Sequence, residues 1–396
     1  MSSYPVKKKK IMIIAGESSG DFLGSRLISQ LKKIDPTLEF AGVGGDLMKR
    51  EGLKSLAPME ILSIMGFTQI FKSIIKIFRL RRKLINKIKT GEYLGIVTID
   101  APGFSFWFGK KIKKMNVSHI HYVAPTVWAW KKNRAAKITK FLDAILCLFP
   151  FELPYFEKEG LKSFFVGHPL IEKFKISSQE SKERYLKKFK LLPHSKILCI
   201  LPGSRSSELK YHTAIFLEAA RDFCKKQAYD AIFIPTISGK EKLLKELIKG
   251  INIKNLPPIY IQTDSNDRPL LYQSSTIALA ASGTVTLELA CSLTPMVVAY
   301  KVSKLNALIA KLFLKIKYVS MVNILYKKKI IPELLQDNCT PLKLAKSLSI
   351  VAEKPKEQLK YMENMSEFLS LEKKMPSKRA AEVIAQMWSL PQEPKI

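Results

Sequence analysis

A short polar turn and the glutamate that follows it have the types and spacing to hold an anion and a pair of hydroxyl groups. Ser282-Gly283-Thr284 separates an apolar run, Ile277–Ala281, from a helix-like run that contains Glu288. Gly283 has no side chain, so a phosphate could approach the first N–H groups of the helix, which attract anions. Glu288 shares a helix face with Thr284, where a carboxylate suits two hydroxyls, such as those of a ribose. The alternative is a plain polar turn followed by a solvated glutamate.

A candidate base and a candidate cation follow two other strand-like runs. Asp100 ends the run Gly95–Asp100, and the sequence after it predicts a turn. A carboxylate there is well placed to act as a general base, although a helix-cap or turn role is equally ordinary. Arg205 follows the run Lys196–Leu201, beside a predicted helix start. A fixed cation there is a good partner for a diphosphate, and the alternative is a surface arginine.

The first glycine-bounded loop of the chain gives a weaker signal. Ile11–Ala15 predicts a strand, Gly16–Asp21 a loop and residues 22–33 a helix. The pattern resembles a nucleotide-binding turn, but it lacks GxGxxG. It is therefore equally well explained as a strand-to-helix turn with Ser19 or Asp21 as the helix cap.

Repeated strand–turn–helix units must position all of these residues. Apolar runs bounded by glycine or proline and followed by helix-like runs are typical of a parallel α/β sheet. Ligands of such sheets bind beyond the carboxyl ends of the strands. The runs that predict further strands are Phe40–Val43, His119–Val123, Ala231–Pro235, Ile259–Ile261 and Met296–Tyr300.

Length and composition limit the class of protein. A chain of 396 residues favours about two domains, and 47% hydrophobic residues exclude wholesale disorder. The formal charge of +32, from 66 basic and 34 acidic residues, implies a nucleic acid, an anionic membrane surface or a phosphorylated substrate as partner. The five cysteines form no CxxC pair, which indicates free thiols in a reducing cytosol. Neither the cysteines nor the histidines have metal-ligand spacing.

Two segments combine basic and apolar residues without any acid. They are Gly66–Lys89 and Lys301–Lys317. Each is interpreted as a basic amphipathic segment on a membrane surface, and the alternative is a helix with a solvated basic face. No apolar stretch reaches the roughly 18 residues that span a bilayer. The run after Lys7–Lys10 is too short for a signal peptide. We therefore expect a cytosolic protein that lies against a membrane.

Short sequence motifs recur in order along most of the chain. They are AGESSGD at Ala15–Asp21, GVGG at Gly42–Gly45, MGF at Met65–Phe67, IDAPGF at Ile99–Phe104, HYVAPTVWAW at His121–Trp130, PFE at Pro150–Glu152, FVGHPL at Phe165–Leu170, LPGSR at Leu201–Arg205, ASGTVTLE at Ala281–Glu288, PMVVAY at Pro295–Tyr300 and PELLQ at Pro332–Gln336. In this order and spacing they resemble the lipid-A-disaccharide synthase family from Ile11 to about Gln336. HYVAPTVWAW and FVGHPL are highly specific to that family, whereas LPGSR and ASGTVTLE alone indicate only a related glycosyltransferase.

The resemblance implies a GT-B fold, an α/β architecture of two Rossmann-like domains with a cleft between them. We expect an acceptor-binding domain at residues 1–172, a linker at 173–195, a UDP-sugar-binding domain at 196–350 and C-terminal helices at 351–396 that pack back on the first domain. The implied reaction is an inverting transfer from UDP-2,3-diacylglucosamine to 2,3-diacylglucosamine 1-phosphate. The product is a β-1,6-linked disaccharide 1-phosphate on the path to lipid A and lipopolysaccharide, together with UDP. No cofactor, metal or nucleic acid is implied. The expected location is the cytoplasm, peripheral on the cytoplasmic face of the anionic inner membrane, and a homodimer is possible.

The resemblance also implies roles for particular residues. Asp100 is the candidate general base for the acceptor 6-hydroxyl, and Glu17 and Asp21 are further acceptor-side candidates. On the donor side, Arg205 should face the diphosphate, Ser282, Gly283 and Thr284 should line the phosphate turn, Glu288 should hold the ribose, and Asn323 and Gln336 should border the site. The chain departs from the family pattern at Gly103, where a second acid is usual, and at Met321-Val322-Asn323, where the family usually has LPN.

Other interpretations predict different behaviour. Another GT-B enzyme acting on UDP-sugars, an epimerase or a different glycosyltransferase, would act on soluble, unacylated sugars. A basic nucleic-acid-binding protein would explain the charge, but the basic residues flank Ile, Leu and Phe rather than forming nucleic-acid motifs. A purely structural membrane-surface role would not explain the matched strand–glycine–helix turns.

Overall fold

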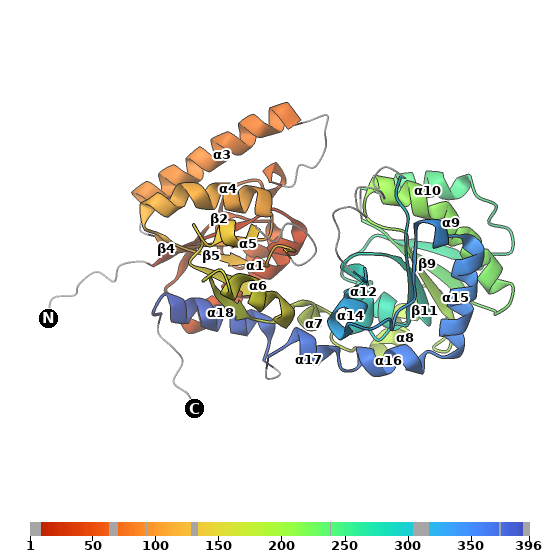
Figure 1. Ribbon diagram of the computed structural model, residues 1–396. Coiled ribbons are helices and arrows are strands. Elements are labelled where there is room, and N and C mark those ends of the chain that lie inside the picture. Colours follow the sequence, from red (N-terminus) through yellow and green to blue (C-terminus); the bar gives the residue numbers. More distant parts are fainter. Residues whose placement is uncertain are drawn as a thin grey trace. The chain divides into compact units, whose positions relative to one another are not determined.

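The computed structural model describes residues 9–62, 70–91, 93–127, 134–237, 239–303, 317–371 and 374–390. The chain divides into two compact units, Met1–Pro169 with Phe368–Ile396 and Leu170–Glu367 (Figure 1). Each unit is built around one sheet whose strand pairs are all parallel. The predicted α/β architecture is therefore confirmed.

The first unit contains a seven-stranded sheet in the order β3-β2-β1-β4-β5-β6-β7. Its strands are β1 (Lys10–Ala15), β2 (Glu39–Val43), β3 (Leu53–Ala57), β4 (Tyr93–Ile99), β5 (Ser118–Tyr122), β6 (Ala144–Cys147) and β7 (Lys162–Phe165). Its helices are α1 (Ser18–Ile34), α2 (Asp46–Arg50), α3 (Ile70–Thr90), α4 (Pro102–Ile112), α5 (Arg134–Ile138), α6 (Leu153–Glu157) and α18 (Pro376–Met387). Short 3₁₀ turns lie at Met59–Ile61, Lys113–Met115 and Pro150–Glu152.

Helices cover both faces of the first sheet, which is why most residues of its central strands β1, β4 and β5 are buried. Met12 and Ile14 of β1 pack with Leu84 of α3 and Phe108 of α4 on one face. Helices α1 and α18 contact each other on the opposite side of the sheet in Figure 1. Beyond α18, the Trp388 indole donates to Ser118 Oγ at 2.8 Å, so the last described residues are part of this unit.

The second unit contains a six-stranded sheet in the order β10-β9-β8-β11-β12-β13. Its strands are β8 (Ile197–Leu201), β9 (Ala231–Pro235), β10 (Ile259–Gln262), β11 (Ile277–Ala281), β12 (Met296–Tyr300) and β13 (Glu333–Leu335). Its helices are α7 (Leu170–Lys173), α8 (Gln179–Lys187), α9 (Ser206–Cys224), α10 (Glu241–Lys249), α11 (Arg268–Gln273), α12 (Val285–Cys291), α14 (Met321–Tyr326), α15 (Pro341–Glu353) and α16 (Lys356–Met362). Helix α17 (Met365–Leu369) carries the chain back to the first unit, and a 3₁₀ turn lies at Gln336–Asn338.

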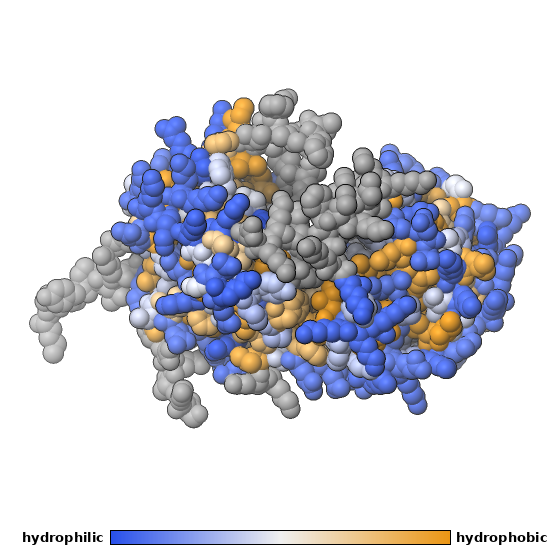
Figure 2. Space-filling model, in the orientation of Figure 1, coloured by the Kyte–Doolittle hydropathy of each residue, from blue (hydrophilic) through white to orange (hydrophobic). Residues whose placement is uncertain are grey.

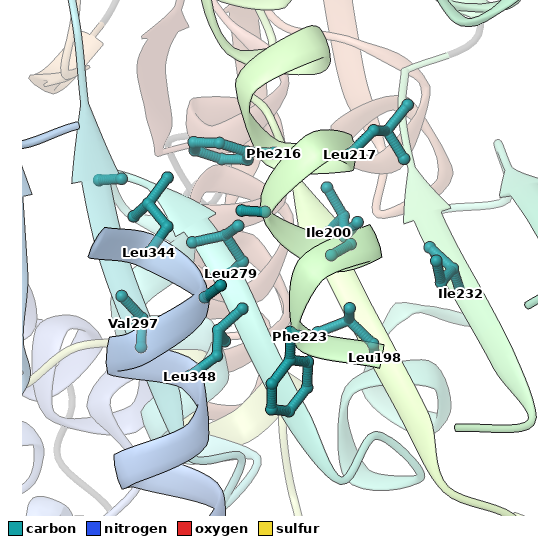
Figure 3. Close-up of a cluster of buried hydrophobic side chains, with 14 of the residues drawn as sticks. Leu198, Ile200, Phe216, Leu217, Phe223, Ile232, Leu279, Val297, Leu344 and Leu348 are labelled. Atoms are coloured by element: carbon teal, nitrogen blue, oxygen red, sulfur yellow. The ribbon is translucent and has the colours of Figure 1, made fainter. Parts of the chain in front are cut away.

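Helices α9 and α15 cover one face of the second sheet and build its core. Figure 3 shows Phe216 and Phe223 of α9 over β8, with Leu344 and Leu348 of α15 beside Leu279 of β11. The cluster is dry, because its members are at most 9% exposed. Close packing on this scale holds the carboxyl ends of the strands, and the loops after them, in fixed positions.

Some expectations fall outside the described residues. These are the MGF motif at Met65–Phe67, the last three residues of the HYVAPTVWAW motif, and residues 66–69 and 304–316 of the two basic-apolar segments. Among the helices that the structure describes, none is long and apolar enough to cross a membrane. The five cysteines are free, as the sequence indicates.

Candidate functional site

The order of the first sheet reverses between β1 and β4, which makes their carboxyl ends the ligand-binding position of such a fold. Ala15 pairs with Ile99, so the loops that begin at Gly16 and Asp100 leave the sheet side by side. A Cβ on Gly16 would lie 3.0 Å from the Cβ of Ala101, which shows how closely the two loops approach. The structure therefore brings the Glu17 loop and Asp100 together at one edge of the unit.

Asp100 has an unusual backbone and a partly buried side chain. Asp100 and the following Ala101 are both left-handed, with φ of 49° and 45°. Such conformations cost about 1–3 kcal/mol each in a non-glycine residue and cluster at functional sites. The Asp100 N–H donates to the Tyr122 carbonyl at 2.9 Å, and Ser105 Oγ donates to the Asp100 carbonyl at 2.8 Å. Burial raises the pKa of the Asp100 carboxyl, which makes its carboxylate a stronger base.

The departure at Gly103 is not forced by packing. Gly103 is exposed in the first turn of α4, and a Cβ there would meet no atom within 4 Å. A longer side chain would fit, so this chain lacks the usual second acid without any steric reason.

Glu17 and Asp21, the other two acceptor-side candidates, differ in accessibility. Glu17 is half-buried at the start of α1. Asp21 is 6% exposed, and its carboxylate accepts N–H groups of Gly45 at 2.8 Å, Leu47 at 3.1 Å and Met48 at 3.1 Å. Asp21 therefore holds the glycine turn and α2 in place.

The second sheet reverses its order between β8 and β11, and the predicted donor residues follow these two strands. Pro202–Arg205 follows β8, Ser282-Gly283-Thr284 follows β11, and Gln336 follows β13. Because the strands are parallel, the three segments lie at the same edge of the unit. The structure thus brings together most of the predicted donor residues.

Arg205 lies at the start of α9 and is available to an anion. Its side chain is 71% exposed, and Nη1 lies 3.5 Å from Glu208 Oε1. An exposed ion pair of this kind contributes little to stability, so the guanidinium can turn to a ligand at small cost. The first N–H groups of this helix add partial positive charge at the same place.

The turn after β11 is open above its glycine. Gly283 and Thr284 are exposed, and a Cβ on Gly283 would meet no atom within 4 Å. Ser282 Oγ donates to the Val319 carbonyl at 3.1 Å, and Thr286 Oγ1 donates to the Gly283 carbonyl at 2.9 Å. These two hydrogen bonds fix the turn, while its backbone at Gly283 remains accessible to a phosphate.

Glu288 is not the solvated helix residue of the alternative interpretation. Burial raises the pKa of its carboxyl, while Lys173, Arg268 and a hydrogen bond from the Tyr272 hydroxyl favour the ionised form. The pKa of Tyr272 is itself well above its ordinary value, first because of burial and then because of the Glu288 charge, so the phenol stays protonated and donates. This environment keeps one carboxylate oriented in a low-dielectric position.

Asn323 and Gln336, both expected to border the donor site, differ in how deeply they are buried. Asn323 is completely buried, and its Nδ2 donates to the Ile331 carbonyl and to Glu333 Oε1, both at 2.8 Å. Its Oδ1 accepts the N–H groups of Ile330 and Ile331, so its side chain is fully used within the protein. Gln336 is half-buried and left-handed, and its Oε1 accepts the Val302 N–H at 3.4 Å. Only Gln336 remains near enough to the surface to border a ligand.

Four side chains that support these loops were not singled out from the sequence. Glu208, His212 and Tyr300 hold the Arg205 loop, and Glu333 accepts the N–H groups of Val319 and Ser320. Only Glu208 had a sequence signal, since an acid three residues after a helix start is typical of a capping box. Among the described residues, no group of three or more His, Cys, Asp or Glu side chains could hold a metal ion.

The fold and the two switch points define the class of protein. The chain is similar in fold to the UDP-GlcNAc 2-epimerase of Neisseria meningitidis bound to UDP-GlcNAc, with a TM-score of 0.60, 15% identity and coverage of 96% of this chain and 99% of that one. A glycosyltransferase from Rickettsia africae has a TM-score of 0.57, 16% identity and coverage of 96% and 98%. The chain has the GT-B fold that these proteins share.

Sequence similarity then identifies the family. The model of the lipid-A-disaccharide synthetase family matches residues 11–387. Lipid-A-disaccharide synthase of Rhodospirillum centenum is 36% identical over 385 residues, 96% of this chain and 94% of that one. The corresponding protein of Rickettsia canadensis is 36% identical over 397 residues, covering 98% and 99%. The chain belongs to the lipid-A-disaccharide synthetase family and is a glycosyltransferase. The resemblance read from the motifs is confirmed, and the epimerase and nucleic-acid alternatives are not favoured.

Proposed function

We propose that this chain transfers a diacylglucosamine unit from UDP-2,3-diacylglucosamine to 2,3-diacylglucosamine 1-phosphate, with inversion at the donor carbon. Membership of the family supports lipid A disaccharide synthesis in general. The observation that supports the particular reaction is which side chains lie at the two points where strand order reverses. A partly buried carboxyl of raised pKa, Asp100, follows β4, whereas an exposed cation, Arg205, follows β8.

The acceptor side of the reaction requires one base. In the proposed step the acceptor 6-oxygen forms a bond to C1 of the donor sugar while the bond from C1 to the UDP oxygen breaks. The hydroxyl proton passes to the Asp100 carboxylate, and the electron pair of the broken bond leaves with UDP. General base catalysis of this kind contributes about 10²–10⁴-fold to the rate. Glu17, on the neighbouring loop, is a candidate for contacting the acceptor sugar.

The donor side of the reaction requires positive charge for the leaving group. Arg205 and the first N–H groups of α9 are proposed to contact the diphosphate, together with the Ser282-Gly283-Thr284 turn. Glu288 is proposed to accept the ribose hydroxyls; burial raises the pKa of its carboxyl, and the charges of Lys173 and Arg268 oppose that shift. Gln336 is proposed to border this site, whereas Asn323 supports it from within the core.

We further propose that α3 contacts the anionic inner membrane that carries both lipid substrates. Its inner face packs in the core through Leu80, Leu84 and Ile88. On its outer face Ile75 is 54% exposed and Phe78 is 50% exposed. Figure 2 shows hydrophobic atoms over this helix beside hydrophilic ones. Exposed apolar side chains among lysines and arginines are typical of helices that lie in the membrane interface.

The proposed reaction is tested with the purified full chain and both acylated glucosamine substrates. We expect UDP and disaccharide 1-phosphate to appear in equal amounts, and only when donor and acceptor are both present. UDP release is followed continuously, and the disaccharide is identified by mass spectrometry. Absence of the disaccharide would reject the proposal, and epimerisation of unacylated UDP-GlcNAc under the same conditions would favour the alternative enzyme class.

A further inference from the structure

Three side chains form a hydrogen-bonded network behind the Arg205 loop. Glu208 and His212 lie one turn apart on α9, and Tyr300 is the last residue of β12. His212 is completely buried, and its ring lies 5.2 Å from that of Tyr300. The proposed chemistry uses none of the three, although all of them lie at the carboxyl edge where the donor site is proposed.

His212 links the backbones of two different loops. Its Nδ1 lies 2.8 Å from the Pro202 carbonyl, in the loop after β8. Its Nε2 lies 2.9 Å from the Lys301 N–H nitrogen and 3.1 Å from the Lys301 carbonyl, just after β12. Because the Lys301 N–H must donate to Nε2, the ring proton belongs on Nδ1, where it donates to Pro202. Burial lowers the pKa of His212, which favours this neutral form.

Glu208 makes a second link between the same loops. Its Oε2 accepts the N–H groups of Ser204 at 2.9 Å and Arg205 at 3.1 Å, and its Oε1 accepts the Tyr300 hydroxyl at 3.1 Å. The loop can close over this carboxylate because Gly203 has φ of +119°, and a Cβ there would lie 2.5 Å from Glu208. The backbone around Arg205 is therefore held at three residues, 202, 204 and 205.

The network connects loops that follow two strands of the sheet, so its effect extends beyond local stability. Strands β8 and β12 are not neighbours, because β11 lies between them. The network therefore joins the two strand ends that flank the Ser282-Gly283-Thr284 turn. It continues to β13, since the Val302 N–H donates to Gln336. The spacing between Arg205 and the phosphate turn depends on these contacts.

We propose that His212 is a positioning residue of the donor site, which fixes the Arg205 loop relative to the loops after β11 and β12. This inference rests on the proposed function, in which a nucleoside diphosphate contacts both Arg205 and the β11 turn. Binding of one diphosphate by two loops is sensitive to their spacing, because displacements of about 1 Å at a site of this kind have large effects. His212 acts through backbone groups and does not itself touch the ligand.

The test is His212→Phe in the full-length chain, with Thr294→Val as the matched control. Phenylalanine retains a ring that can stack on Phe216, 5.3 Å away, but it can make neither backbone hydrogen bond. Thr294→Val removes one buried hydrogen bond, 2.7 Å long, at the opposite edge of the same sheet. We expect His212→Phe to raise the donor KM and the UDP dissociation constant about 10-fold or more, with the acceptor KM unchanged. Thr294→Val should leave all three constants unchanged.

The outcomes separate positioning from stability alone. His212→Gln, whose amide can both donate and accept, should recover part of the UDP affinity, and equal donor constants in His212→Phe and Thr294→Val would overturn the proposal. If His212→Phe does not fold, Tyr300→Phe removes the hydroxyl that donates to Glu208 and also contacts the Arg205 side chain. That variant must then raise the donor KM selectively, and unchanged constants would again overturn the inference. UDP binding is measured by calorimetry without acceptor, so the role of His212 is judged separately from whether the wild-type chain forms a disaccharide.

Discussion

Asp100 and Asp21 lie near the same edge of the first sheet, but their surroundings give them different chemistry. Asp21 accepts three backbone N–H groups, which satisfy its carboxylate within the protein. The raised pKa of Asp100 comes first from burial, and the opposing hydrogen bond is to the Ala101 backbone. A carboxylate that accepts several backbone N–H groups, as Asp21 does, stabilises the local fold. A buried carboxylate at a strained turn, as in Asp100, is a candidate base.

At the residue scale, the first prediction concerns Asp100→Asn. Asparagine is nearly the same size but cannot accept the acceptor proton, so we expect kcat to fall at least about 10²-fold while UDP affinity is preserved. Turnover is measured by UDP release and affinity by calorimetry. Asp46→Asn, at an acid of 84% side-chain exposure in the same unit, should leave kcat unchanged. Near-normal turnover of Asp100→Asn would remove it from the role of base.

The residue types of the site could be predicted from the sequence, but their hydrogen-bond partners could not. Asp100 and Arg205 follow apolar runs that end at recognisable turns, so their positions at strand ends could be predicted from the sequence. Asp21 binds Gly45, which is distant in the sequence, and nothing near Asp21 signals that contact. The partners of Asn323 could not be predicted either, because the N–H groups of Ile330 and Ile331 reach its amide only in the folded chain.

At the element scale, buried strands were predicted most closely. The strands Ile277–Ala281, Ala231–Pro235 and Met296–Tyr300 have the same bounds as the apolar runs that predict them. Strand β3 was not predicted, because its position at the edge of the sheet leaves most of its residues partly exposed and its sequence pattern weak. Helix α9 begins at Ser206, directly after Arg205, and Glu208 caps its first turn.

The second prediction concerns the outer face of α3. Replacing the exposed Lys76, Arg79 and Arg82 with serine should weaken binding to anionic vesicles about 10²-fold, since each basic residue near such a surface contributes about 1 kcal/mol. Arg81 is left unchanged because its guanidinium lies 3.4 Å over the Trp107 ring and belongs to the packing of α3 on α4. Binding is measured by co-sedimentation with phosphatidylglycerol vesicles.

A matched set of substitutions controls for net charge. Helix α10 carries three exposed lysines, Lys242, Lys245 and Lys249. Changing these three to serine removes the same charge from the chain, but vesicle binding should remain within about twofold of wild type. Equal losses in both variants would mean that overall charge, rather than α3, attracts the protein to the membrane.

At the scale of the whole molecule, buried histidines make stability depend on pH. Burial lowers the pKa of His119 to about 4, of His121 to about 3 and of His168 to about 4, from an ordinary value of 6.5. As pH falls below 6.5 the unfolded chain takes up these protons first, so stability falls between about pH 6.5 and 3. Asp100 and Glu288 act in the opposite sense, because their raised pKa values let the folded protein bind protons first.

The third prediction follows from this balance. We expect the free energy of unfolding of the first unit, measured by urea denaturation, to fall between pH 7 and pH 5, by up to about 2 kcal/mol for each of the three histidines at pH 5. His121→Asn should retain a hydrogen bond to Thr98 while making the pH dependence shallower by about one proton. His194→Gln, in the second unit, should leave the slope of the first unit unchanged. A midpoint independent of pH would contradict the buried, neutral state of these rings.

The return of the C-terminal helix to the first unit has a consequence for biosynthesis. The groove over Gly95 is filled by the indole of Trp388, and α1 is covered by α18, yet both come from the end of the chain. The ribosome must therefore synthesise the whole second unit before the residues that complete the first unit are available. Nascent chains stopped after residue 169 should expose the α1 surface and attract chaperones, whereas the second unit, Leu170–Glu367, is continuous and can finish folding during translation.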